Sequence, residues 1–177
     1  MNLYILRHAS AGTPRPNPIL DEKRPLDKEG KKHCLQLAHV LNALDIQFSL
    51  VISSPLKRCL QTASLVGTET GYEAQILTST ALAPSATLKD FQKLLRDNAD
   101  QENLLVVGHN PNLTNFLGAL LVPASSPEAK VRIRKGSLAR VVLTRGPATL
   151  QGLIDPRVVR ALYATSTKSS RRKTSRK

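Results

Sequence analysis

Short apolar runs alternate along the chain with longer stretches in which apolar residues recur at every third or fourth position. The runs are typical of strands, and the longer spacing is typical of helices that pack through one face. The runs predict strands at residues 3–6, 48–52, 75–78, 104–107, 140–144 and 149–154. The helical spacing predicts helices at residues 27–44, 54–70, 88–95, 113–121 and 156–163.

Two segments carry strong local signals. Ser54 is a good N-cap and Pro55 suits the first position of a helix, so we expect the second helix to start there. Residues 9–26 contain Gly12 and four prolines, and we expect them to form a loop without a helix.

The alternation of strands and helices predicts an α/β fold, a three-layer αβα sandwich around a mostly parallel central sheet. We expect the last two strands to pair antiparallel across a Gly146-Pro147 turn. Ligands of such sheets gather beyond the carboxyl ends of the strands. Three polar pairs fall at expected strand ends: Arg7-His8, Ser53-Ser54 and Gly108-His109.

The composition is that of a globular domain, with 41% hydrophobic and 22% charged residues. No apolar run approaches the ~20 residues that span a bilayer, and Met1-Asn2 leads directly into the first strand without a secretory signal. We therefore expect a cytoplasmic location and no insertion into a membrane. Cys34 and Cys59 lie on apolar helix faces and are expected to be reduced core residues. No CxxC or HExxH pattern supports a metal site.

The formal net charge is +13, and six of the basic residues lie in the last thirteen positions. A segment this basic and without apolar residues cannot bury enough surface to order itself. We expect one domain over residues 1–164 and a disordered tail over residues 165–177. The tail is either solvated or attached electrostatically to nucleic acid, acidic protein or a membrane surface.

Arg7 and His8 end the first strand, and they suit phosphoryl chemistry. An imidazole can attack phosphorus while a guanidinium holds the phosphoryl oxygens. Arg58 lies in the first turn of its helix, off the apolar stripe, and His109 follows a strand. Each residue taken alone is more often an ordinary surface or loop residue, so their combination carries the argument.

In this order and spacing, Arg7-His8, Ser54-Pro55-x-x-Arg58-x-x-Gln61-Thr62 and Gly108-His109 resemble the histidine phosphatase superfamily, also called phosphoglycerate mutase-like, over about residues 3–155. The short chain, Arg24-Pro25-Leu26 and Lys135-Gly136-Ser137-Leu138-Ala139 are most similar to SixA-type phosphohistidine phosphatases. These small members lack the inserted subdomain that covers the active site in mutase-like relatives. Ala9 departs from the glycine that usually follows the Arg-His pair, which would restrict the backbone if a positive φ were required.

The resemblance implies that His8 is the nucleophile and forms a transient phosphohistidine that water hydrolyses. It implies that Arg7, Arg58 and His109 hold the phosphoryl oxygens, with His109 protonated or donating an N–H. Arg24 is a further candidate for binding the substrate. No cofactor or metal is implied, because side chains supply the positive charge.

The sequence leaves open which residue, if any, protonates the leaving group. Mutase-like relatives protonate it with a carboxylic acid that follows the third strand, but residues 80–86 contain none. We expect Asp90 to lie on the surface, and Asp21, Glu22 and Asp27 remain open as alternatives. A missing acid favours a P–N substrate such as phosphohistidine, or an activated ester, because either of these releases its leaving group more easily than an alkyl phosphate releases an alkoxide.

Three functions remain open. The first is a phosphohistidine phosphatase acting on a histidine-containing phosphotransfer domain. The second is a phosphatase for a small phosphorylated metabolite, and the third is a catalytically weak binding or scaffold protein whose basic tail contacts nucleic acid.

Overall fold

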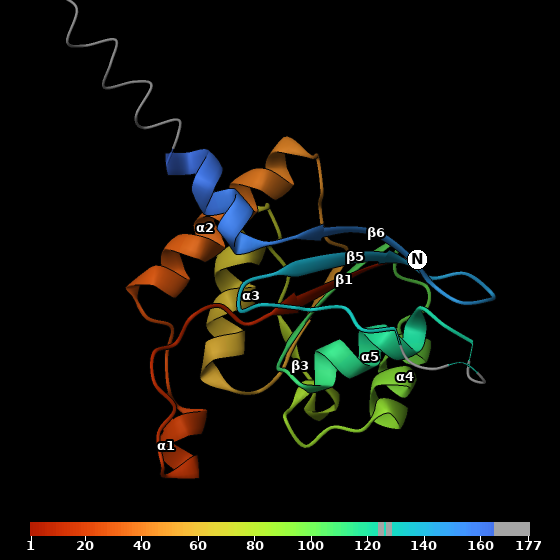
Figure 1. Ribbon diagram of the computed structural model, residues 1–177, viewed down its shortest axis with the longest axis horizontal. Helices are drawn as coiled ribbons and strands as arrows, with labels where there is room; N and C mark the ends of the chain where they lie inside the picture. Colours follow the sequence, from red (N-terminus) through yellow and green to blue (C-terminus); the bar gives the residue numbers. More distant parts are fainter. Residues whose placement is uncertain (124–125, 127–128, 165–177) are drawn as a thin grey trace, which may run out of the picture.

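The computed structural model describes residues 1–123, 126 and 129–164, so the predicted tail over 165–177 lies outside the described residues. One six-stranded sheet runs through the molecule in the order β3-β2-β4-β1-β5-β6 (Figure 1). The strands are β1 (Asn2–Arg7), β2 (Leu50–Ser53), β3 (Leu77–Thr78), β4 (Asn103–Gly108), β5 (Leu138–Val142) and β6 (Thr149–Ile154). All six lie at or within a few residues of the predicted strands.

The sheet is mostly parallel, as predicted. β4 pairs in parallel with β1 and β2, and β2 pairs in parallel with β3. β5 is antiparallel to both β1 and β6, so the predicted antiparallel pairing of the last two strands is confirmed. The parallel strands bring their carboxyl ends to one edge of the sheet.

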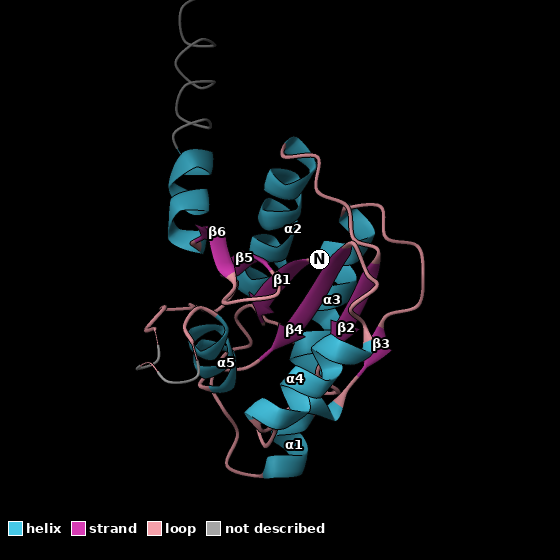
Figure 2. Ribbon diagram, turned by 90° about the vertical axis from the view of Figure 1, so that its right-hand side faces the viewer, coloured by secondary structure: helices cyan, strands magenta, loops and turns pink. Residues whose placement is uncertain are grey.

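Helices cover both faces of the sheet (Figure 2). They are α1 (Pro18–Glu22), α2 (Lys28–Ala43), α3 (Lys57–Glu69), α4 (Leu88–Asp97) and α5 (Asn112–Leu120), and residues 156–164 are also helical. Residues 79–87, which include a 3-10 turn at Thr80–Leu82, connect β3 to α4. So short a connection leaves no space for an inserted subdomain at this point.

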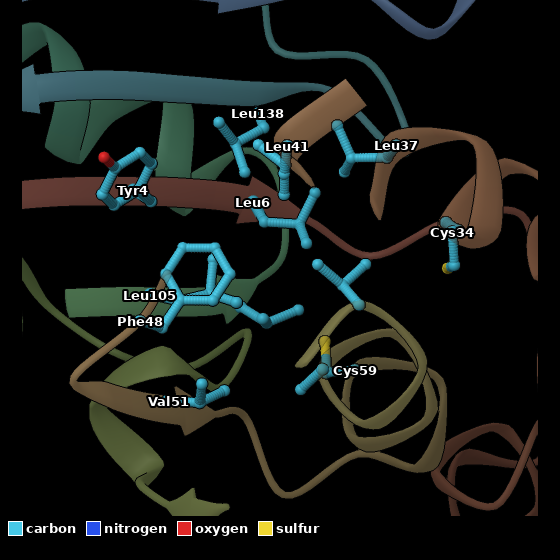
Figure 3. Packing of buried hydrophobic residues seen from close by; sticks show 14 of the residues in the cluster. Tyr4, Leu6, Cys34, Leu37, Leu41, Phe48, Val51, Cys59, Leu105 and Leu138 are labelled. Atoms are coloured by element: carbon cyan, nitrogen blue, oxygen red, sulfur yellow. The ribbon is translucent and has the colours of Figure 1, made fainter. Parts of the chain in front are cut away.

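Successive side chains of β1 point to opposite faces of the sheet and enter two separate cores. Tyr4 and Leu6 pack with residues of α2 and α3, a cluster that Figure 3 shows from close by. Leu3 and Ile5 pack with the apolar faces of α4 and α5. Both cores are closed to solvent, so the predicted three-layer αβα sandwich is confirmed.

The two cysteines belong to the first of these cores. Cys34 and Cys59 are buried and unpaired, as predicted. Burial raises the pKa of each thiol to about 12, which keeps both in the neutral form.

The prediction that residues 9–26 hold no helix is wrong. α1 forms a short helix there, because Asn17 accepts hydrogen bonds from the N–H groups of Ile19 and Leu20 and caps it. Pro18 occupies the first helical position, where proline lacks only an N–H that would have had no helical partner. Proline spacing excludes a helix interior but not a helix start.

The predicted start of the second helix is also wrong. α3 begins at Lys57 with Leu56 as its N-cap, and no side chain caps it. The backbone N–H of Ser54 still donates to the carbonyl of Val107 on β4, at 2.9 Å, which holds Ser54 beside the sheet. Its hydroxyl is therefore available to another partner.

Candidate active site

The carboxyl ends of β1 and β4 bring the two predicted histidines together. Arg7 on β1 pairs with Gly108 on β4, and the residue that follows each of them is a histidine. The backbone N–H of His8 donates to the carbonyl of Gly108 at 3.1 Å. The ring centroids of His8 and His109 lie 5.1 Å apart, close enough for one phosphoryl group to contact both rings.

The ring of His8 is held in a single tautomer. Nδ1 lies 2.8 Å from the carbonyl oxygen of Ala9, and because a carbonyl only accepts, Nδ1 must carry the hydrogen. Burial lowers the pKa of His8 to about 3, and the charges of Arg58, Arg7 and Lys135 add to this effect. His8 is therefore neutral near pH 7, with the lone pair on Nε2.

His109 is also buried and neutral. Burial, followed by the charges of His8, Arg58 and Arg7, lowers the pKa of its ring to about 3. Nε2 lies 2.8 Å from the hydroxyl of Ser54 and 3.3 Å from the thiol sulfur of Cys59. In the free site, His109 is therefore a neutral ring near pH 7 that carries one N–H.

Two guanidinium groups stand beside these rings. Arg58 is 6% exposed, and its Nη1 donates to the backbone carbonyl of Asp21 at 3.0 Å. Arg7 is half-buried and donates from Nη1 to the carbonyl of Ile133 at 3.0 Å. The Nε atoms of both arginines are buried without a hydrogen-bond partner among the described residues.

Asp21 lies at the edge of this cluster. Oδ2 of its carboxylate is 3.2 Å from Nη1 of Arg58, and Oδ1 accepts from Nε of Arg24 at 2.8 Å. The hydrogen bond from Arg24 is the main reason why the pKa of Asp21 falls to about 2. Asp21 is therefore an ionised acceptor near pH 7 and has no proton to give to a leaving group.

Arg24 is linked to the other predicted site residues through Asp21. Its guanidinium is 7% exposed, and Nη1 donates to the carbonyls of Ala11 at 2.8 Å and Gly12 at 3.2 Å. With Asp21 as its third partner, Arg24 reaches the cluster through the Asp21 carboxylate.

The other candidate carboxylates lie elsewhere. Asp27 caps α2 and accepts from the hydroxyl of Ser10 at 2.6 Å, and Glu22 is exposed on α1. Asp90 is exposed and forms a capping box with Thr87 at the start of α4, which agrees with its predicted surface position.

Ser54, Gln61 and Thr62 hold the site together, although sequence reasoning gave them no such roles. The hydroxyl of Thr62 accepts from the N–H of Ala9 at 3.1 Å and donates to the carbonyl of Arg58 at 2.7 Å. Gln61 accepts from the N–H of Leu26 at 2.7 Å, which ties the 9–26 loop to α3. Ala9 does not have a positive φ, so alanine fits where a glycine was expected.

Over the part of the chain that the structure describes, no three His, Cys, Asp or Glu side chains gather closely enough to hold a metal ion. The same residues include no helix that is long and apolar enough to cross a membrane.

Comparison with known proteins agrees with this arrangement. Residues 3–83 match the family described as histidine phosphatase superfamily (branch 1). The chain belongs to the histidine phosphatase superfamily. It is accordingly a phosphatase. An uncharacterised protein of Picosynechococcus is 33% identical over 123 residues, which cover 68% of this chain and 73% of that protein.

Solved structures share the fold. The protein histidine phosphatase SixA complexed with tungstate has a TM-score of 0.79 at 23% identity, over 90% of this chain and 99% of that one. A SixA structure from Agrobacterium tumefaciens has a TM-score of 0.70 at 21% identity, over 88% of this chain and 97% of that one. A mutant phosphoserine phosphatase from Entamoeba histolytica in complex with phosphoserine has a TM-score of 0.66 at 12% identity, over 88% and 97%.

Proposed function

We propose that this phosphatase removes the phosphoryl group from a phosphorylated histidine of a protein, such as a histidine-containing phosphotransfer domain. The observation that carries the proposal is the state of His8. Its ring is buried and neutral, and the hydrogen bond from Nδ1 to the carbonyl of Ala9 leaves the lone pair on Nε2. A nucleophile for phosphorus needs this lone pair.

In the proposed reaction, Nε2 of His8 attacks phosphorus and the P–N bond to the substrate histidine breaks. The substrate ring carries a proton on its other nitrogen, so it departs as neutral imidazole. Water then attacks the phosphohistidine on His8, which releases inorganic phosphate and restores the ring. Arg7, Arg58 and His109 bind the phosphoryl oxygens in both steps, and fixed cations such as the two guanidinium groups supply most of the stabilisation in phosphoryl transfer.

The choice of a P–N substrate rests on proton supply. Asp21 is the carboxylate beside Arg58, and with a pKa of about 2 it is ionised near pH 7. Residues 80–86 contain no carboxylate. An alkoxide needs a proton donor in order to leave, whereas a phosphohistidine that is protonated on its other ring nitrogen releases neutral imidazole without one.

A phosphatase for a small phosphate ester is the second candidate, because the fold is also similar to that of the phosphoserine phosphatase from Entamoeba histolytica. We propose that residues 1–164 carry the activity and that the protein acts in the cytoplasm.

The test compares wild type with His8→Gln on a phosphorylated phosphotransfer domain and on a panel of small phosphate esters. His39→Gln is the matched control, because that ring is exposed and hydrogen-bonds to Tyr163, outside the cluster. We expect rapid loss of the protein label with wild type and His39→Gln, and almost none with a folded His8→Gln. Faster turnover of the esters than of the protein would favour the second candidate. Full activity of His8→Gln would exclude His8 as the nucleophile, and no turnover of any substrate by wild type would leave a binding or scaffold role.

A further inference from the structure

An open groove of about 440 Å³ begins at the active site and continues away from it. Its walls come from the end of β1, the start of α2, the residues after β4, the segment before β5 and the C-terminal helical residues. Six of its lining residues are basic: Arg7, Arg132, Arg134, Lys135, Arg157 and Arg160.

The near end of this basic groove is fixed to the nucleophile strand. The N–H of Gly136 lies 3.0 Å from the carbonyl of Arg7 and 3.2 Å from that of His8. The N–H of Arg7 donates in turn to the carbonyl of Ser137 at 3.1 Å. These bonds hold the segment with Lys135 beside His8, so the groove that Arg7 and Lys135 line lies next to the proposed nucleophile.

Carboxylates neutralise only part of the positive charge. Arg160 pairs with Glu29 at 2.9 Å, while Arg134 and Arg157 share Asp155 at 3.3 and 2.9 Å. Within the described residues, the other three cations of the groove, Arg7, Arg132 and Lys135, have no carboxylate within ion-pair distance. The groove therefore has an excess of positive charge.

The far end of the groove is open to solvent. The side chains of Arg157 and Arg160 are 59% and 44% exposed, and Arg132 and Lys135 are also exposed. A protein surface approaching from solvent could contact both ends at once.

We propose that the basic groove binds acidic side chains that flank the phosphorylated histidine on the substrate protein. This inference rests on the proposed function and names the class of substrate, a phosphoprotein with carboxylates beside its phosphorylated residue. Complementary charge at such a surface speeds association and selects between partners. The same contacts weaken as salt is raised.

The test uses the full chain and two synthetic phosphohistidine peptides of equal length, one with glutamates around the phosphohistidine and one with glutamines. The variant is Arg132→Glu with Arg157→Glu, which reverses two exposed charges of the groove. The matched control is Lys89→Glu with Arg145→Glu, which makes the same change in net charge at exposed positions outside the groove. A direct binding measurement uses the unphosphorylated acidic peptide and a single-stranded oligonucleotide, at low and high salt.

We expect wild type and control to prefer the acidic peptide, mainly through KM, and the groove variant to lose about tenfold in kcat/KM on that peptide alone. Binding of the unphosphorylated acidic peptide should weaken in the same variant. Equal turnover of both peptides by wild type, with unchanged peptide binding in the variant, would overturn the groove assignment and leave the proposed function standing. Tighter binding of the oligonucleotide than of the peptide would overturn it in favour of nucleic acid.

Failure of the proposed function gives a different result. If neither phosphopeptide is turned over, the phosphohistidine assignment fails. The binding measurement then still decides whether the groove takes an acidic peptide.

Discussion

The carboxylate of Asp21 lies 3.2 Å from Nη1 of Arg58, so a negative charge already contacts a guanidinium that we assign to phosphoryl binding. Asp21 is carried by α1, which has no buried residues, and it is anchored by Arg24. Substrate and Asp21 therefore compete for the same cation.

Asp21→Asn should strengthen the binding of anions at the site. The amide keeps an oxygen that can accept from Arg24 but removes the negative charge, so we expect the inhibition constant of inorganic phosphate to fall about threefold, the scale of a partly exposed ion pair. Steady-state inhibition by phosphate measures this change. Glu22→Gln is the control, because it removes the neighbouring charge from an exposed position. An unchanged or larger inhibition constant, with an unchanged melting temperature, would show that Asp21 does not compete with the substrate.

Folding stability should fall as the pH is lowered below about 6.5. The pKa values of His8 and His109 drop from 6.5 to about 3 on folding, so between these limits the unfolded chain binds protons that the folded chain does not. For each pH unit below 6.5, each of these histidines lowers the free energy of unfolding by about 1 kcal/mol. Above pH 6.5 the stabilisation that comes from keeping the ring neutral is fully present. Urea unfolding at pH 7.5, 6 and 5 measures the slope.

His109→Asn should make that slope shallower, because it removes one of the two groups. His39→Asn, at an exposed ring, should leave the slope as in wild type. Equal slopes for His109→Asn and wild type would mean that the pKa of His109 does not fall on folding.

The sequence predicted the site residues that follow strands, and it failed for those that depend on loop closure. His8 and His109 could be predicted to meet because parallel strands end at one edge. The contact of Asp21 with Arg58 could not, because it requires α1 to form inside a proline-rich loop and to fold back onto α3. Ser54 was expected to cap a helix because its sequence context fits that role, and nothing local shows that its hydroxyl forms a hydrogen bond with Nε2 of His109, 55 residues away.

Thr62→Val should reduce both stability and kcat. Valine has nearly the shape of threonine but cannot accept the N–H of Ala9, which becomes a buried donor without a partner at a cost of about 1–3 kcal/mol. Since Ala9 also fixes the tautomer of His8, we expect kcat to fall more than KM rises. Thr70→Val is the control: that hydroxyl donates only to carbonyls of its own helix, Val66 and Gly67. Equal loss of kcat in the two variants would argue against the positioning role of Thr62.

Gly30→Ala should disturb the site from a distance. A Cβ at this position of α2 would collide with the backbone carbonyl of Ser10, two residues after His8, and a backbone atom cannot move aside as a side chain can. We expect a loss of about 1–3 kcal/mol in unfolding free energy, typical of overpacking, together with reduced kcat. Urea unfolding and steady-state kinetics measure the two effects.

Gly152→Ala on β6 is the matched control, because a Cβ there meets no atom within 4 Å. This variant should keep wild-type stability and activity. If Gly30→Ala were as stable as wild type, the loop that begins at Ser10 would have to move away from the new methyl group at no cost to α2. If kcat were also unchanged, the hydrogen bond from Nδ1 of His8 to Ala9 would not depend on the position of that loop. Both results together would contradict the prediction.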